Sequence, residues 1–288
     1  MMKALYSGVS GMRSHQTKMD VIGNNIANVN TNGYKSQRAT FRDVYYQQIK
    51  SPGGGIEGTR GGTNASQVGY GAQISSVDTI HTLSGYSPTN KSTDLYINGD
   101  GYFMVQNASG EQFLTRYGAF NFDPTGNLVD SSGSLVLGLN KDDAETGVDD
   151  DGIMTGLVPI SIEDFNNYKN ITINSDGTIT GYNIKAAADA EPIEIIGRIG
   201  IAYVPNQDAL ILEGNSYYSE SNNTGDIITY SAGLGQTGEI VAFGLEMSNV
   251  DLANEFSDMI ITQRGFQANT KIISVVDQML EELVNLKR

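Results

Sequence analysis

A cluster of aspartates is the feature of this sequence that most directly suggests a chemical role, namely the binding of a cation. The segment 139–156 holds Asp142, Asp143, Asp149, Asp150 and Asp151. Carboxylate oxygens are the ligands that Ca²⁺ prefers, but the segment lacks the alternate spacing and the terminal glutamate of an EF-hand loop. We therefore interpret it as an acidic surface loop. No cofactor or metal is expected, although the sequence leaves Ca²⁺ binding by this loop open.

Two other patterns are weaker indications of chemistry. Residues 53–58 and 233–238 match G-x-G-x-x-G, but a dinucleotide site needs this motif after a strand and at the start of a helix. The first match lies in a glycine-rich linker and the second precedes an expected strand. The histidines are His15 and His81, cysteine is absent, and no Ser-His-Asp spacing stands out. We expect no catalytic residues and no enzyme.

Composition narrows the class of partner. The 288 residues carry a net charge of −15, which argues against nucleic acid, because phosphate binding needs a basic surface. Residues 1–50 hold seven bases and two acids, whereas residues 241–288 hold four bases and seven acids, so opposite charge favours association of the two ends. No apolar run is long enough for membrane insertion. The N-terminus lacks the apolar core of a Sec signal, so export would need another route.

The C-terminal segment 252–286 is predicted to be a long helix that starts after a capping pair formed by Ser248 and Asp251. Its apolar positions recur at intervals of seven or fall beside that row, namely Leu252, Phe256, Met259, Phe266, Ile273, Val276, Leu280, Leu283 and Val284. The row three positions further on begins with polar residues, unlike a two-stranded zipper. We therefore expect a polymerisation helix, in which Gln263, Arg264 and Asn269 make polar contacts between subunits or face a wet channel.

The N-terminal segment 3–28 is the expected partner of that helix. Its apolar face is Leu5, Val9, Met12, Met19, Ile22 and Ile26. Glycines at 8, 11 and 23 each lower helix stability by about 1 kcal/mol relative to alanine, so this helix should form mainly by packing. A simple intramolecular helical hairpin is the alternative, but two helices of this length exceed what a β-rich centre would cover.

The centre of the chain is predicted to be β structure. Short apolar runs from 76 to 245 alternate with turn signals such as Asn98-Gly99 and Asp176-Gly177. No helical pattern lies between the strands, which favours an antiparallel β-sandwich or barrel. The expected organisation is a discontinuous helical assembly domain (1–40 plus 246–288), a connector (41–75) and a β domain (76–245). The basic part of the connector would be a short helix or extended chain, and its glycine-rich part, 51–75, a loop.

The ends carry a resemblance to a known family. The matching residues are Ser7-Gly8-Val9-Ser10-Gly11-Met12, NNIANVNT (24–31), Thr262-Gln263-Arg264 and Asp277-Gln278-Met279-Leu280. Two internal segments, DLYINGDGYFMV (94–105) and RYGAFNFDPTGNLVDSSGSLVLG (116–138), match as well. On these segments the chain is similar to bacterial flagellar rod and hook proteins. The ends SNVDL (248–252) and VNLKR (284–288) are most similar to the hook protein, in a compact form, and the distal rod protein is the alternative.

The resemblance implies a mainly β fold with long terminal helices, paired as a coiled-coil-like layer around an export channel, and the β domain outside. It implies a structural subunit of the flagellar hook, which self-assembles into a flexible tube and transmits torque from motor to filament. The implied partners are further copies of the chain, the distal rod protein and hook–filament junction protein at the ends, the hook cap, and the flagellar type III export apparatus. The location would be the extracellular flagellum, reached without a cleaved signal peptide. A secreted β-domain adhesin would explain the acidic middle but not the helical ends.

Overall fold

The computed structural model describes residues 2–55, 61–141, 143–144, 147–149, 151–162, 165–185 and 193–286. The chain forms two compact units. The terminal unit comprises Met1–Val29, Ser36–Ile80 and Val250–Arg288, and the β unit comprises Asn30–Lys35 and His81–Asn249. Among the described residues, no helix is long and apolar enough to cross a membrane.

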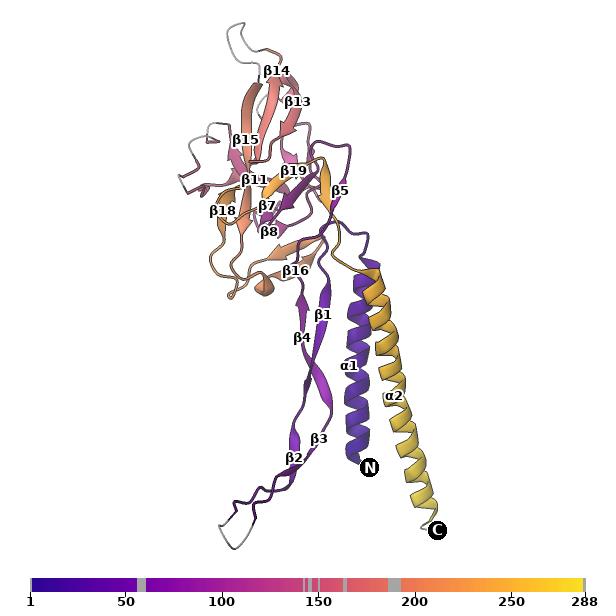
Figure 1. Cartoon of the computed structure of the whole chain (residues 1–288). Helices are drawn as coiled ribbons and strands as arrows, with labels where there is room; N and C mark the ends of the chain where they lie inside the picture. The colour runs from indigo at the N-terminus through magenta and orange to yellow at the C-terminus, as the bar shows by residue number, and fades with distance from the viewer. Residues whose placement is uncertain are drawn as a thin grey trace. The chain divides into compact units, whose positions relative to one another are not determined.

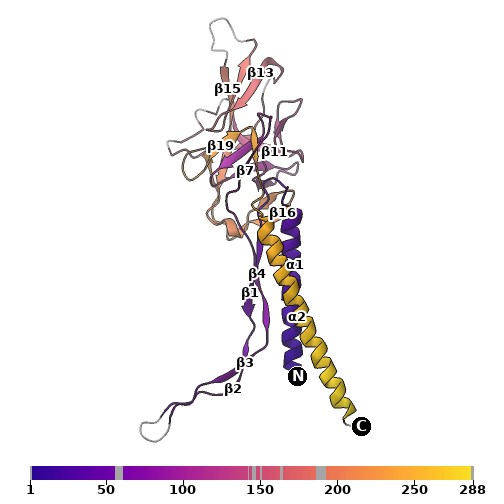
Figure 2. The same cartoon turned by 45° about the vertical axis from the view of Figure 1, so that its right-hand side comes forward.

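The terminal unit contains the two long helices that the sequence predicted. Helix α1 spans Met2–Ala27 and helix α2 spans Leu252–Asn285. Figures 1 and 2 show them side by side and antiparallel, with α2 running past the N-terminal end of α1. Asp251 caps α2, because its side chain accepts hydrogen bonds from the backbone N–H groups of Ala253 (2.9 Å) and Asn254 (3.4 Å).

A long β-hairpin completes the terminal unit, where the sequence predicted a short helix or extended chain followed by a loop. Strand β1 (Gln37–Asp43) pairs with β4 (Ala72–Thr79), and β2 (Tyr46–Lys50) pairs with β3 (Ser66–Gly69) (Figure 1). Cross-strand contacts hold this ribbon together, as in the 2.8 Å hydrogen bond between the Thr40 and Ser76 hydroxyls. The loop prediction for 51–75 was therefore wrong for β3 and for the start of β4.

The β unit is built from short antiparallel strands. The main sheet has the order β13-β14-β15-β11-β7-β8-β17-β16, with β9, β10, β12 and β18 attached to it. Two smaller ladders pair β19 with β6 and β20 with β5. The strands are β5 Tyr86–Pro88, β6 Leu95–Asn98, β7 Tyr102–Gln106, β8 Gln112–Thr115, β9 Asn121–Phe122, β10 Leu128–Val129, β11 Leu135–Asn140, β12 Val158–Pro159, β13 Tyr168–Ile173, β14 Thr178–Asn183, β15 Ile193–Tyr203, β16 Ile211–Gly214, β17 Tyr217–Ser219, β18 Ile228–Ser231, β19 Glu239–Ala242 and β20 Gly244–Glu246; two 3-10 turns lie at Phe165–Asn167 and Gln207–Ala209.

Strand β15 curls the sheet. Its first part pairs with β14 and β11, and its last part pairs with β7 and β18, so one strand serves two stretches of sheet. The strand continues without a break through Gly197, where a Cβ would lie 2.9 Å from the Leu139 carbonyl oxygen. The absence of a side chain thus permits close strand pairing without a break.

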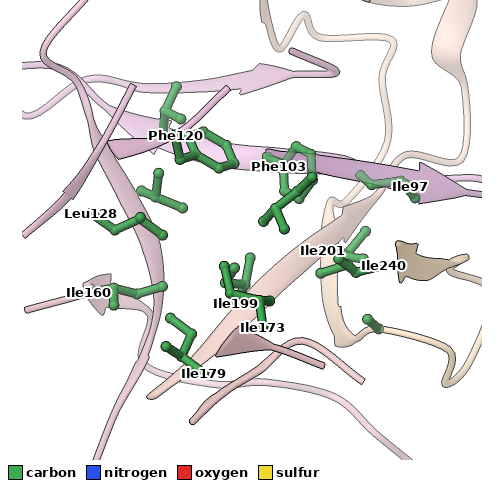
Figure 3. Close-up of a cluster of buried hydrophobic side chains, with 14 of the residues drawn as sticks. Ile97, Phe103, Phe120, Leu128, Ile160, Ile173, Ile179, Ile199, Ile201 and Ile240 are labelled. Carbon is green, nitrogen blue, oxygen red and sulfur yellow. The ribbon is translucent and has the colours of Figure 1, made fainter. Parts of the chain in front are cut away.

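The concave side of this sheet encloses the main hydrophobic core. Figure 3 shows isoleucines from β14, β15 and β19 facing Phe103 and Phe120. The two phenylalanine rings meet edge to face, with centroids 5.1 Å apart. The predicted fold class, mainly β with paired terminal helices, is confirmed.

The acidic segment 139–156 is described only in part, and Asp142 and Asp150 lie outside the described residues. Its described portion forms a turn in which the Gly152 N–H donates to the Asp149 carbonyl at 2.8 Å, beside a bridge between Val148 and Met154. Within the described ranges, no group of three His, Cys, Asp or Glu side chains is arranged to hold a metal ion.

The core makes a direct stability prediction. Phe120→Ala should lower the free energy of unfolding of the β unit by about 3–5 kcal/mol, because the fully buried ring leaves a cavity beside Phe103. Ile193→Ala removes a side chain that is 63% exposed, and it should change the same quantity by less than about 0.5 kcal/mol. Chemical denaturation followed by tyrosine fluorescence measures both, and equal effects would contradict this assignment of the core.

Candidate functional site: an assembly surface on the terminal helices

The apolar face predicted for α1 is partly covered inside the chain. Ile22 is only 3% exposed, so the C-terminal part of this face belongs to the core of the terminal unit. The remaining predicted residues are half-buried, namely Leu5, Val9, Met12, Met19 and Ile26. Burial by α2 and the β1–β4 ribbon supplies the packing that a helix with three glycines needs.

The predicted row of α2 divides into covered and exposed residues. Val276 is 4% exposed, and the other covered members are half-buried, namely Met259, Phe266, Ile273 and Leu280. Leu252, Phe256, Leu283 and Val284 remain exposed, at 39%, 51%, 49% and 66%. The structure thus places the middle of the row inside the chain and leaves its two ends open.

Glycines lie where the two helices approach most closely. A Cβ on Gly8 would meet Ile273 Cγ1 at 3.3 Å, and one on Gly265 would meet the His15 ring at 2.6 Å. The opposite pattern holds at Gly23, where a Cβ would meet nothing within 4 Å. The first two glycines are therefore packing residues, which explains why the chain accepts their cost in helix propensity.

Polar pairs fix the register of the helices. Lys18 and Asp258 form an ion pair at 2.9 Å, and the buried Asn25 amide donates to Glu255 at 2.9 Å and to the Gln37 carbonyl at 2.8 Å. Burial raises the pKa of Glu255, and the hydrogen bond from Asn25 opposes that rise. These directional contacts hold α1, α2 and β1 in one alignment.

The predicted intersubunit polar residues fall into two groups. Gln263 and Arg264 are exposed, and Arg264 donates to Gln267 of its own helix at 3.2 Å. Asn269 is half-buried instead, with its amide packed against Gly11, where a Cβ would lie 2.8 Å from Nδ2. Asn269 therefore packs within the chain, and a contact of its exposed part with a neighbouring subunit stays a prediction.

A second apolar stripe runs along α2, about a quarter turn from the helix–helix seam. Its members follow one another at intervals of three or four along the helix, except for one gap of seven, and they face solvent; they are Ile261, Ala268, Ile272, Val275, Met279, Leu283 and Leu286. Sequence reasoning missed most of this stripe because it followed the stricter seven-residue row. Continuous apolar surface of this kind is typical of a surface that binds protein.

A groove in the terminal unit lies between α1 and the hairpin. It has a volume of about 360 Å³ and is lined by Tyr6, Val9, Arg13, Val44 and Ile74, among others. Near it, the Ser14 hydroxyl donates to the Ala72 carbonyl at 3.3 Å. Further along the ribbon, Tyr45 and Tyr46 are more than half exposed. The hairpin thus adds exposed aromatic surface to the same unit as the stripe.

The two histidines have structural surroundings. His15 packs against Phe41, with ring centroids 5.7 Å apart, and burial lowers its pKa. His81 Nδ1 lies 2.9 Å from the Tyr102 hydroxyl, and burial lowers the pKa of His81 to about 4. Neither ring has a nucleophile or carboxylate hydrogen-bonded to it among the described residues.

A mainly β unit joined to paired terminal helices, without a catalytic arrangement among the described residues, fits a structural protein. Three family models match the chain: the flagellar hook protein FlgE/F/G D1 domain at residues 96–181, the flagellar basal body rod FlgEFG protein C-terminal region at 244–286, and the flagella basal body rod protein at 5–35.

Full-length relatives agree with these models. The flagellar basal-body rod protein FlgG of Bacillus subtilis is 44% identical, and that of Buchnera aphidicola from Acyrthosiphon pisum is 34% identical, with at least 99% of each chain covered. The flagellar hook protein FlgE of Borreliella burgdorferi is 28% identical over 443 aligned positions that cover all of both chains. The chain belongs to the flagellar rod and hook protein family, whose members are structural and not enzymes.

The helix contact can be tested with a pair of glycine substitutions. Gly265→Ala should destabilise the terminal unit, because overpacking against His15 costs about 1–3 kcal/mol and helix propensity returns only about 1 kcal/mol. Gly23→Ala should stabilise it by about 1 kcal/mol. Thermal unfolding followed by circular dichroism in the helix band measures both, and a stabilising Gly265→Ala would contradict the close contact.

Proposed function

We propose that this chain is a subunit of the flagellar rod, the alternative that the sequence left open, and not of the hook. The observation that carries this proposal is the 44% identity to a basal-body rod protein over 291 positions, with all of both chains covered. Hook relatives need alignments of 443 and 466 positions at 28% identity. The likeness of the ends to hook protein is therefore outweighed by the whole chain.

The change from hook to rod alters the proposed surroundings. Further copies of the chain and the flagellar type III export apparatus remain the proposed partners. The hook cap and the hook–filament junction protein, which a hook would meet, are no longer proposed. The proposed location is the basal body of the flagellum, reached by export with the N-terminal residues retained in α1. We also keep as a proposal that the helical ends assemble and the β part faces outward.

The exposed stripe of α2 is the proposed contact with neighbouring copies. Burying one large aliphatic side chain contributes about 1.5–3 kcal/mol. Most side chains of the stripe are about half exposed or less in the single chain, and this exposed part is what a neighbouring copy could bury. Leu252 and Phe256 at the start of α2 are also exposed, so a second copy offers further apolar surface on the same helix. Head-to-tail repetition of such a contact produces a ring where the rotation closes and a helical filament where it does not, and the second outcome fits a rod.

Electron microscopy of basal bodies from a strain lacking this gene tests rod against hook. A rod subunit predicts shortened rods and no hooks, because later parts have nothing to build on. Complete rods without hooks would instead support the hook assignment. Restoration of full-length rods by the plasmid-borne gene is the control.

The assembly surface is tested by a double substitution on the stripe. Ile272→Ser with Val275→Ser should raise the critical concentration for tube formation by at least about tenfold, since roughly 1.4 kcal/mol corresponds to each factor of ten. The monomer should keep its circular dichroism spectrum. Gln278→Ser, at an exposed polar position on another side of α2, is the matched control. Unchanged polymerisation of the double variant in sedimentation and negative stain would contradict the proposed surface.

A further inference from the structure

The β unit contains a buried ion cluster at the places where the chain enters and leaves it. The chain passes between the two units at 29/30, 35/36, 80/81 and 249/250. Each passage is followed or preceded, within the β unit, by one of three short segments, 30–35, 81–85 and 246–249. Force that acts along the chain of the terminal segments enters the β unit at these covalent passages.

Lys35 joins all three segments. Its Nζ donates to Glu246 Oε1 at 2.6 Å and to the Thr82 carbonyl at 2.7 Å. The Lys35 and Glu246 side chains are both 1% exposed. Burial lowers the pKa of Lys35, and the neighbouring Glu246 opposes that shift. One ammonium group therefore ties segment 30–35 to the other two.

The same carboxylate connects the cluster to the sheet. Arg116, which follows β8 directly, places Nη1 3.5 Å from Glu246 Oε2, and its side chain is 2% exposed. The guanidinium also lies 5.1 Å from the centre of the Tyr102 ring on β7. Glu246 thus binds the passage segments with one oxygen and a residue anchored in the core with the other.

Backbone contacts give the segments a single alignment. The Gly33 N–H donates to the Glu246 carbonyl at 2.8 Å, and the Met247 N–H donates to the Gly85 carbonyl at 2.9 Å. Gly33 has a φ of +72°, and a Cβ there would lie 3.1 Å from the backbone of Arg116 and Tyr117. Only glycine fits this position without strain. The Asn249 amide donates to the Thr82 hydroxyl at 3.1 Å.

We propose that the cluster of Lys35, Arg116 and Glu246 is a clamp that holds the three passage segments in register and transmits load on them to the core of the β unit. Buried ion pairs add little net stability compared with apolar residues of the same volume, so stability alone does not account for three buried charges. They are directional, because sliding of one segment along another breaks hydrogen bonds that an apolar contact would keep. The load-bearing part of this proposal rests on the proposed rod function.

Hydrogen exchange of the monomeric full-length chain tests the clamp without assembly. In Lys35→Met, amides in 30–35, 81–85 and 246–249 should exchange at least about tenfold faster together, while amides of β7 and β15 keep their rates. Faster exchange in the substituted segment alone, or an equal increase in the core, would overturn the clamp. Lys35→Met with Glu246→Met removes both charges, and it should show the same three-segment loosening in a folded chain.

Lys141→Met is the matched control, because it removes a lysine whose 2.5 Å ion pair with Glu194 lies at the surface of the same unit. It should leave the three segments unchanged. Shear of assembled tubes tests the load-bearing part: Lys35→Met tubes should break at lower shear than wild-type tubes. Equal resistance would overturn load transmission while leaving the rod function intact, and failure of the wild type to form tubes would count against the rod function alone.

Discussion

The terminal unit depends on the close antiparallel contact between α1 and α2. Helix α1 contains glycines that weaken it in isolation, so it needs the surface of α2 to remain ordered. The contact is close because Gly8 and Gly265 leave room for Ile273 and His15 of the facing helix. Every other feature of the unit, including the ribbon that packs on α1 and the exposed stripe of α2, is positioned by this pairing.

The β unit has a different source of order. Its core is enclosed by a curled antiparallel sheet in which strand β15 pairs with several neighbours. The order of this unit therefore comes from strand pairing and a shared core, and not from a helix–helix contact. A self-contained core and a helix pair with uncovered apolar surface are a consistent division of labour for a subunit that polymerises. In the proposed assembly, the β unit stays folded in the free chain and the helix pair presents the surface that copies share.

Sequence periodicity predicted the elements with strong local patterns. The helices followed from apolar spacing, and most strands of the β unit followed from turn signals between short apolar runs. The hairpin of β1–β4 was missed because its stability comes from pairing between residues about forty apart, as at Thr40 and Ser76, and its own composition is polar. The clamp was equally invisible, because Lys35 and Glu246 are separated by 211 positions and neither carries a local signal.

The two faces of α2 explain why the apolar positions that recur every seven residues gave only part of the proposed assembly surface. Polar residues at Glu255, Thr262 and Asn269 interrupt the seam, and the structure places them against α1, where they specify register. Apolar residues such as Ile272 and Met279 lie further round the helix, where 45% and 41% of their surface stays exposed. The internal face of α2 combines apolar residues such as Val276 and Phe266 with polar residues that align the helices. The outer face offers non-directional apolar contacts for the proposed assembly.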